Sequence, residues 1–112
     1  MKKLILTLSC AMILTISPVV LQAKTGEELF LKYCKACHGT DGKGQTAMGK
    51  KLKIKDYTKA EVQAEFTDEY MAKVIKEGIK NEKGKKVMLP FEKKMTPEEI
   101  AEVVAYVRSL KE

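Results

Sequence analysis

Tryptophan is missing from this 112-residue chain, and its one histidine is His38. Cysteine and proline occur only three times each. A structural zinc site takes four ligands, usually as two spaced pairs, so this scarcity of cysteine and histidine counts against one. A phosphate-binding loop is not indicated either, because Gln45 follows Gly39 and Gly44 where that motif requires a lysine. A chain of this length forms one domain at most.

An excess of charge of one sign is also largely lacking. The chain has 21 lysines and arginines against 15 acids, which gives a net charge of +6. The positive residues are spread along the sequence without interleaved aromatic residues. Nucleic-acid binding is usually marked by a concentrated basic patch. We therefore do not expect a nucleic acid among the partners.

Residues 1–23 are predicted to be a cleaved secretory signal peptide. Two lysines precede an uncharged, mostly apolar run at residues 4–21, and Ala23 supplies the small residue expected at the cleavage site. The alternative is an uncleaved membrane anchor, because residues 4–21 approach the length that crosses about 30 Å of hydrocarbon. Cys10 lies inside this segment, so the predicted mature domain, residues 24–112, keeps two cysteines. Export would place this domain in the periplasm.

Helix signals recur along the predicted domain. Three Thr-x-x-Glu sequences have the form of a capping box, and they begin at Thr25, Thr58 and Thr96. Together with the apolar periodicity they predict helices at residues 26–37, 59–66, 68–77 and 97–110. No segment alternates as a strand, and the loops at 39–50 and 78–90 show no periodicity. We therefore predict an all-α domain of about four short helices that wrap around a cofactor.

The stretch YCKACHG places Cys34, Cys37 and His38 within five positions. Half of a zinc site, a redox-active dithiol and a covalent haem attachment are the three sites that this spacing allows. A redox dithiol is expected at the N-terminus of a helix that follows a strand, whereas this pair lies at the end of a predicted helix. In the haem interpretation both thiols form thioethers with the vinyl groups of the porphyrin, and the imidazole ligates the iron. Cys-x-x-Cys-His is typical of c-type haem attachment.

The chain resembles the small class I cytochromes c over essentially all of residues 24–112. The matching residues are Gly26, Phe30, Cys34, Cys37 and His38, then the segments 88–91, 96–100 and 105–108. The resemblance implies one covalently attached haem c with its iron, and N- and C-terminal helices that cross where Gly26 meets Tyr106. The family often has a proline shortly after the haem motif, whose carbonyl accepts a hydrogen bond from the proximal histidine. Residues 45–50 contain no proline.

A methionine is expected as the second axial ligand of the iron, because ligation by His and Met is typical of electron-transfer haems. Met88 is the predicted ligand, since it precedes the stiffening Pro90 and also matches the family. Met48, in a loop flanked by glycines, is the rival. We assign Met71 to the core on the apolar face of its helix. Met95 directly precedes a helix cap, where a hydrophobic staple residue belongs.

The expected function is that of a soluble periplasmic one-electron carrier. With His38 and Met88 on the iron no site is open for a substrate, so the protein is not expected to be an enzyme. The expected partners are a membrane complex or dehydrogenase as donor and an oxidase or reductase as acceptor. A group of lysines either steers an acidic partner or forms a plain solvated face: Lys43, Lys50, Lys51, Lys53 and Lys55. The alternatives are a haem-based ligand sensor or weak peroxidase, and an electron-entry subunit of a larger redox enzyme.

Overall fold

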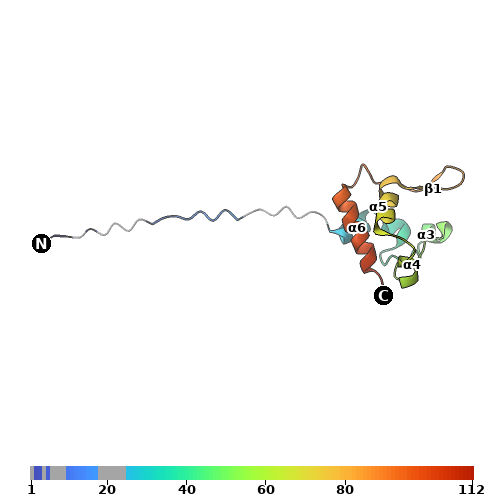
Figure 1. Ribbon diagram of the computed structural model, residues 1–112, viewed down its shortest axis with the longest axis horizontal. Coiled ribbons are helices and arrows are strands. Elements are labelled where there is room, and N and C mark those ends of the chain that lie inside the picture. Colours follow the sequence, from blue (N-terminus) through green and yellow to red (C-terminus); the bar gives the residue numbers. More distant parts are fainter. Residues whose placement is uncertain (1, 4, 6–9, 18–24) are drawn as a thin grey trace.

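The computed structural model describes residues 2–3, 5, 10–17 and 25–112 (Figure 1). The predicted cleavage after Ala23 lies outside the described residues, as does much of the apolar run at 4–21. Residues 10–17 contain no helix or strand. In the part of the chain that the structure describes, no helix has both the length and the apolar character needed to cross a membrane.

Six helices and one short antiparallel strand pair make up residues 25–112. In chain order they are α1 (Gly26–Tyr33), α2 (Lys35–His38), α3 (Ala47–Leu52), α4 (Ala60–Gln63), α5 (Asp68–Glu77), β1 (Ile79–Lys80), β2 (Lys86–Met88) and α6 (Pro97–Ser109). Figure 1 shows α5 and α6 side by side and the β1–β2 hairpin at the far end of the domain, and α5 and α6 are indeed in contact. The predominance of helix is as predicted.

The first and last helices begin as the sequence predicts. Thr25 accepts a hydrogen bond from the Glu28 backbone N–H, and the Glu28 carboxylate accepts one from the Thr25 N–H. Thr96 and Glu99 make the same reciprocal pair at the start of α6. Each box satisfies two backbone donors that the first turn of a helix otherwise leaves without partners.

The prediction of a capping box at Thr58 is wrong. The Thr58 hydroxyl and backbone N–H both donate to the Asp56 carboxylate, at 2.6 and 2.9 Å. The hydroxyl is thereby used as a donor in a local turn and does not cap a helix, which is the competition that short polar side chains offer to helix formation. Helix α4 instead begins at Ala60, after Lys59 and without a side-chain cap.

The loops at residues 39–50 and 78–90, which show no periodicity in the sequence, both contain short regular elements. Helix α3 begins after Thr46, whose hydroxyl accepts a hydrogen bond from the Gly49 N–H at 2.8 Å. In the second loop the Asn81 side chain accepts from the N–H groups of Lys83 and Lys85, both at 3.0 Å, and this turn joins β1 to β2. The prediction that the domain lacks strands is therefore wrong at this hairpin. A two-strand ladder of two and three residues is too short to show an alternating pattern.

The crossing of α1 and α6 forms the core of the domain. Leu29, Phe30 and Val103 are each 1% exposed. A Cβ atom on Gly26 would lie 2.1 Å from the Glu102 carbonyl oxygen and 3.0 Å from the Tyr106 Cβ, so only glycine allows the two helices to approach this closely. The predicted contact between Gly26 and Tyr106 is confirmed.

Candidate cofactor site

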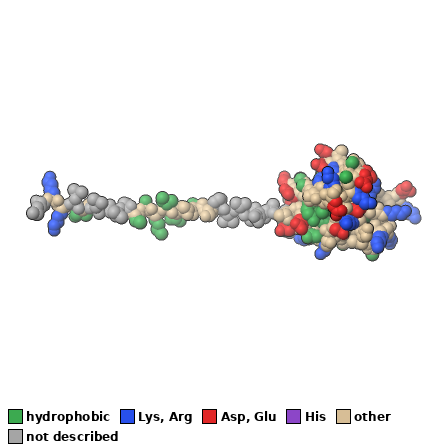
Figure 2. Space-filling view, turned by 90° about the horizontal axis from the view of Figure 1, so that it is seen from below, with side chains coloured by type: hydrophobic (Ala, Val, Ile, Leu, Met, Phe, Trp, Pro, Cys, Tyr) green, Lys and Arg blue, Asp and Glu red, His purple; other side chains and the backbone are tan. Residues whose placement is uncertain are grey.

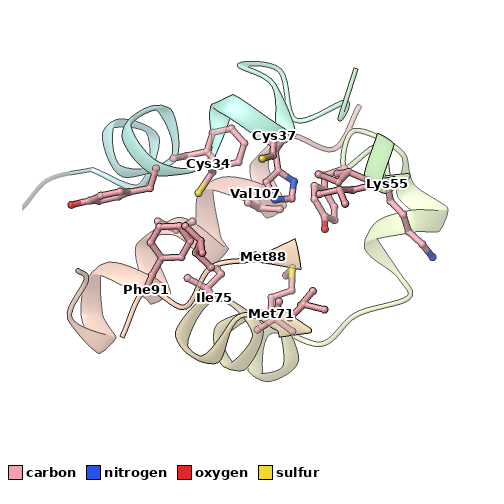
Figure 3. Close-up of a pocket in the computed structure, with 18 of the residues that line it drawn as sticks. Cys34, Cys37, Lys55, Met71, Ile75, Met88, Phe91 and Val107 are labelled. Atoms are coloured by element: carbon pink, nitrogen blue, oxygen red, sulfur yellow. The ribbon is translucent and has the colours of Figure 1, made fainter. Parts of the chain in front are cut away.

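A cavity of about 430 Å³ opens between α1–α2, the 52–57 segment, α5, the hairpin and α6. Figure 3 shows Cys34 and Cys37 on one side of this space and Met71 and Met88 on the other. Its size falls in the range of about 300–1,000 Å³ that is usual for ligand and cofactor sites. Most of the side chains that line it are aliphatic or aromatic.

One helical turn presents the three residues of the sequence motif. Cys34 separates α1 from α2, and its carbonyl accepts hydrogen bonds from the N–H groups of Cys37 at 3.3 Å and of His38 at 2.9 Å. Residues at positions i, i+3 and i+4 of a helical turn share a face. All three side chains accordingly line the cavity. The predicted single helix at 26–37 is in fact two helices with Cys34 at the junction.

The thiol of Cys34 has the character of a buried, inert group. Burial, and after it the charge of the neighbouring Cys37, raise the pKa of Cys34 to about 11. No disulfide joins Cys34 to Cys37. A redox-active dithiol normally has a lowered thiol pKa that produces the reactive thiolate. The shift at Cys34 has the opposite sign, which argues against that interpretation.

The His38 ring is packed between aromatic side chains. Its centroid lies 5.6 Å from that of Tyr57 and 6.3 Å from that of Phe30. Burial lowers the pKa of His38, which favours the neutral imidazole that can bind a metal. The Nδ1 atom is buried and has no hydrogen-bond partner among the described residues.

Helix α3 and the residues just before it pack against the backbone of the motif. The Thr46 hydroxyl donates to the Cys37 carbonyl at 2.6 Å, and the Gly44 N–H donates to the His38 carbonyl at 2.8 Å. A Cβ atom on Gly49 would lie 2.1 Å from the Gly44 carbonyl oxygen and 2.6 Å from that of Cys37. These supporting contacts were missed in the sequence. The signal that could have revealed them is Thr46 three residues before Gly49, a spacing that suits an N-cap.

The four candidate methionines of the predicted mature domain lie in different surroundings. Met88 lines the cavity, as its predicted role requires. Met48 is 44% exposed and does not line it, while Met95 is 3% exposed and belongs to the core. Met71 packs against the core, as predicted, and it also lines the cavity beside Val74. The apolar face of α5 thus covers the cavity, and the site contains two thioethers.

The residues present fit a haem. A flat apolar macrocycle needs an apolar cavity, two thiols for its vinyl groups and a nitrogen or sulfur ligand on each side of the metal. Cys34, Cys37, His38 and Met88 supply these groups around one cavity. Lys53 and Lys55 also line it; Lys55 forms an ion pair with Glu65, and the positive charge of Lys53 suits the acidic side groups of a haem. The fold thereby brings Cys34, Cys37 and His38 together with Met88 at the end of β2.

Comparisons with known proteins agree with this chemistry. Residues 21–107 match the family model described as cytochrome C oxidase, cbb3-type, subunit III. Among solved structures, the chain is similar to the KustC0563 c-type cytochrome, with 38% identity over 80% of this chain and 100% of that chain, and a TM-score of 0.68. A tyrosine-to-phenylalanine mutant of Kustc0563 shows 40% identity over 79% of this chain and 100% of that one, with a TM-score of 0.65. No curated protein sequence matches the chain significantly.

Proposed function

Because this chain belongs to the cbb3-type subunit III family of c-type cytochromes, which bind haem c covalently, we propose that it is a soluble periplasmic one-electron carrier. Haem supplies the one-electron change between ferric and ferrous iron when it is bound. Cys34 and Cys37 would hold it as thioethers, and His38 and Met88 would bind its iron. The observation that carries this proposal is the convergence of these four residues on one apolar cavity.

The protein tunes this chemistry with its own side chains. A neutral thioether from Met88 would stabilise the ferrous state and so would raise the reduction potential. The aliphatic and aromatic side chains of the cavity exclude water, which also disfavours the more highly charged ferric state. Because His38 and Met88 would both bind the iron, no coordination position would remain for a substrate, and we therefore propose a carrier rather than an enzyme.

An absorption spectrum tests the proposal. Protein purified from the periplasmic fraction is expected to show the spectrum of a low-spin c-type haem in both redox states. The oxidised protein should show the weak far-red band of sulfur-to-ferric-iron ligation. The haem should stay with the chain during acid-acetone extraction, because thioether bonds are covalent. Release of the haem by extraction, or a high-spin spectrum that reports an open axial position, would contradict the proposal.

The family description favours a second candidate, the electron-entry subunit of a larger redox enzyme. That description refers to a subunit of an oxidase, and a subunit needs a lasting interface. Gentle detergent extraction of native membranes separates the two candidates. A carrier is expected in the soluble fraction as a small monomer, whereas a subunit would migrate with a large membrane complex.

Docking of the redox partner is proposed at the rim of the cavity. Lys53 and Lys55 line the cavity itself, and Lys50 and Lys51 are exposed on α3 just before them. Lys43 lies apart from this rim and forms an ion pair with Glu112 at 3.9 Å. The hairpin adds four further exposed lysines: Lys80, Lys83, Lys85 and Lys86. Figure 2 shows lysine side chains projecting from the right-hand edge of the domain.

The apolar side chains at this rim complete a docking surface. Ile79 is 41% exposed and Leu89 is 57% exposed, and both line the cavity. An apolar patch beside lysines suits a partner with an acidic surface around an apolar contact. The partner would be a membrane complex or dehydrogenase on the donor side and an oxidase or reductase on the acceptor side.

Replacing Lys50, Lys51 and Lys53 together with glutamine is expected to slow electron transfer to native membranes at low salt. In the wild type the rate should fall steeply with ionic strength, because exposed charges are screened beyond about 10 Å at 0.1 M salt. Stopped-flow kinetics measure both effects. The matched control replaces three exposed lysines that do not line the cavity, Lys73, Lys93 and Lys111. Equal slowing in both triple variants would show that only net charge matters.

A further inference from the structure

In the part of the chain that the structure describes, no hydrogen bond orients the His38 ring through Nδ1. A metal-binding histidine almost always donates its second ring N–H to a carboxylate, a carbonyl or a water, which fixes the plane of the ring. Here Nδ1 is buried without an acceptor among the described residues.

Packing must therefore hold the ring. Phe30 is part of α1, is 1% exposed and packs against Tyr106 with a centroid distance of 5.3 Å. Its position follows from the helix crossing. Tyr57, which lies closer to His38, belongs to the irregular segment between α3 and α4. A residue outside regular structure needs other contacts to fix it.

Gln63 provides such a contact from within the domain. Its side chain is only 5% exposed, and its Nε2 donates to the Tyr57 carbonyl at 2.6 Å and to the Val107 carbonyl at 2.8 Å. Its Oε1 accepts from Arg108 Nη1 at 3.0 Å. Both hydrogens of the amide are used, so this orientation of the side chain is well determined. Gln63 ties the backbone of Tyr57 to α6.

Arg108 in turn fixes Gln63 and the segment that follows it. Its Nη1 donates to the Gln63 carbonyl at 2.5 Å, its Nη2 to the Phe66 carbonyl at 2.5 Å, and its Nε to the Asp68 carboxylate at 2.7 Å. The planar guanidinium can make all these bonds at once because its donors lie in a rigid fork. A lysine at this position could not reproduce them.

We propose that Gln63 and Arg108 are positioning residues for the proximal haem ligand. Through Tyr57 they set the plane of the His38 ring, and they replace the hydrogen bond that Nδ1 lacks. This inference rests on the proposed ligation of haem iron by His38. It identifies residues 25 and 70 positions away from the ligand as determinants of its orientation.

The test compares Gln63→Leu and Arg108→Lys with the wild-type holoprotein. The haem-methyl proton resonances of the oxidised protein depend on the orientation of the axial imidazole plane, and NMR measures them. Both variants are expected to change the spacing of these resonances while covalent haem and the far-red methionine band are retained. Arg108→Lys keeps the charge and provides a result if Gln63→Leu does not fold.

Thr96→Ala serves as the control for stability. It removes the capping hydroxyl at the start of α6, far along that helix from Arg108, and should lower the melting temperature without moving the resonances. If the variants of Gln63 and Arg108 lose stability but keep the wild-type resonances, the network is structural only and the inference is wrong. A His38 Nδ1–H that exchanges slowly and has the shift of a hydrogen-bonded proton would also overturn it. Wild-type protein without covalent haem would instead refute the proposed function, and the inference with it.

Discussion

Alanine at both Cys34 and Cys37 is expected to yield a largely unfolded chain without bound haem. Both cysteines line the cavity, and covalent attachment would be lost with them. The cavity of about 430 Å³ would then have to collapse or fill with water. The apolar side chains that line it would then face water instead of the haem, and the stabilisation from their burial would be lost. Small domains are stable by only about 5–15 kcal/mol in total, so a loss of this kind is expected to unfold the chain.

Circular dichroism and haem content measure this effect directly. The double variant should have little helix at room temperature and should be degraded in the cell, whereas the wild type should melt cooperatively. Cys10→Ala is the matched control, because Cys10 lies in the predicted signal peptide and is exposed. It should have no effect on the haem content of the purified protein. A stable, helical double variant would show that the fold does not depend on the haem.

Met88→Ala is expected to abolish the far-red band and to lower the reduction potential. The thioether favours ferrous iron, and axial ligands set haem potentials over a range of about 0.8 V. The reduced variant should also bind carbon monoxide, because the sixth position is then open. Optical titration against redox mediators gives the potential, and the spectrum with and without carbon monoxide gives the open site. Wild-type protein that binds carbon monoxide equally well would favour the sensor over the carrier.

Two further methionine variants identify the ligand by comparison. Met48→Ala should leave the band unchanged, since Met48 is exposed and does not line the cavity. Met71→Leu keeps most of the side-chain volume but removes the second thioether that lines the cavity. If Met71→Leu removes the band and Met88→Ala does not, the ligand comes from α5 rather than from the hairpin.

Features that depend on residues close together in the chain were predictable. The motif residues Cys34, Cys37 and His38 share a helical face at any place in a fold, because their spacing alone determines it. The capping boxes at Thr25 and Thr96 are equally local and formed as expected. The third box failed because Asp56, two residues earlier, offered Thr58 a competing acceptor. Asp56 can be seen in the sequence, but the sequence does not show whether the Thr58 hydroxyl will bond to Asp56 or cap the helix.

Contacts between distant segments could be decided only by the tertiary structure. The apolar periodicity of α5 predicts that Met71 packs against the core, which it does, but periodicity does not show that Met71 also lines the cavity. The β1–β2 hairpin could not be predicted, because its strands are too short to show an alternation of apolar and polar residues. The same holds for the support of His38, which passes through Tyr57 and Gln63 to Arg108.

The sequence by itself determined the turn that carries Cys34, Cys37 and His38 and the starts of α1 and α6, because local spacing fixes them, and the resemblance to the family implied the close approach of Gly26 to α6. The tertiary structure decided which methionines line the cavity, which lysines lie at its rim and which side chains pack against the His38 ring. Those outcomes depend on how α4, α5 and α6 pack together. Burial and hydrogen bonding across long sequence separations set that packing, and no local pattern records them.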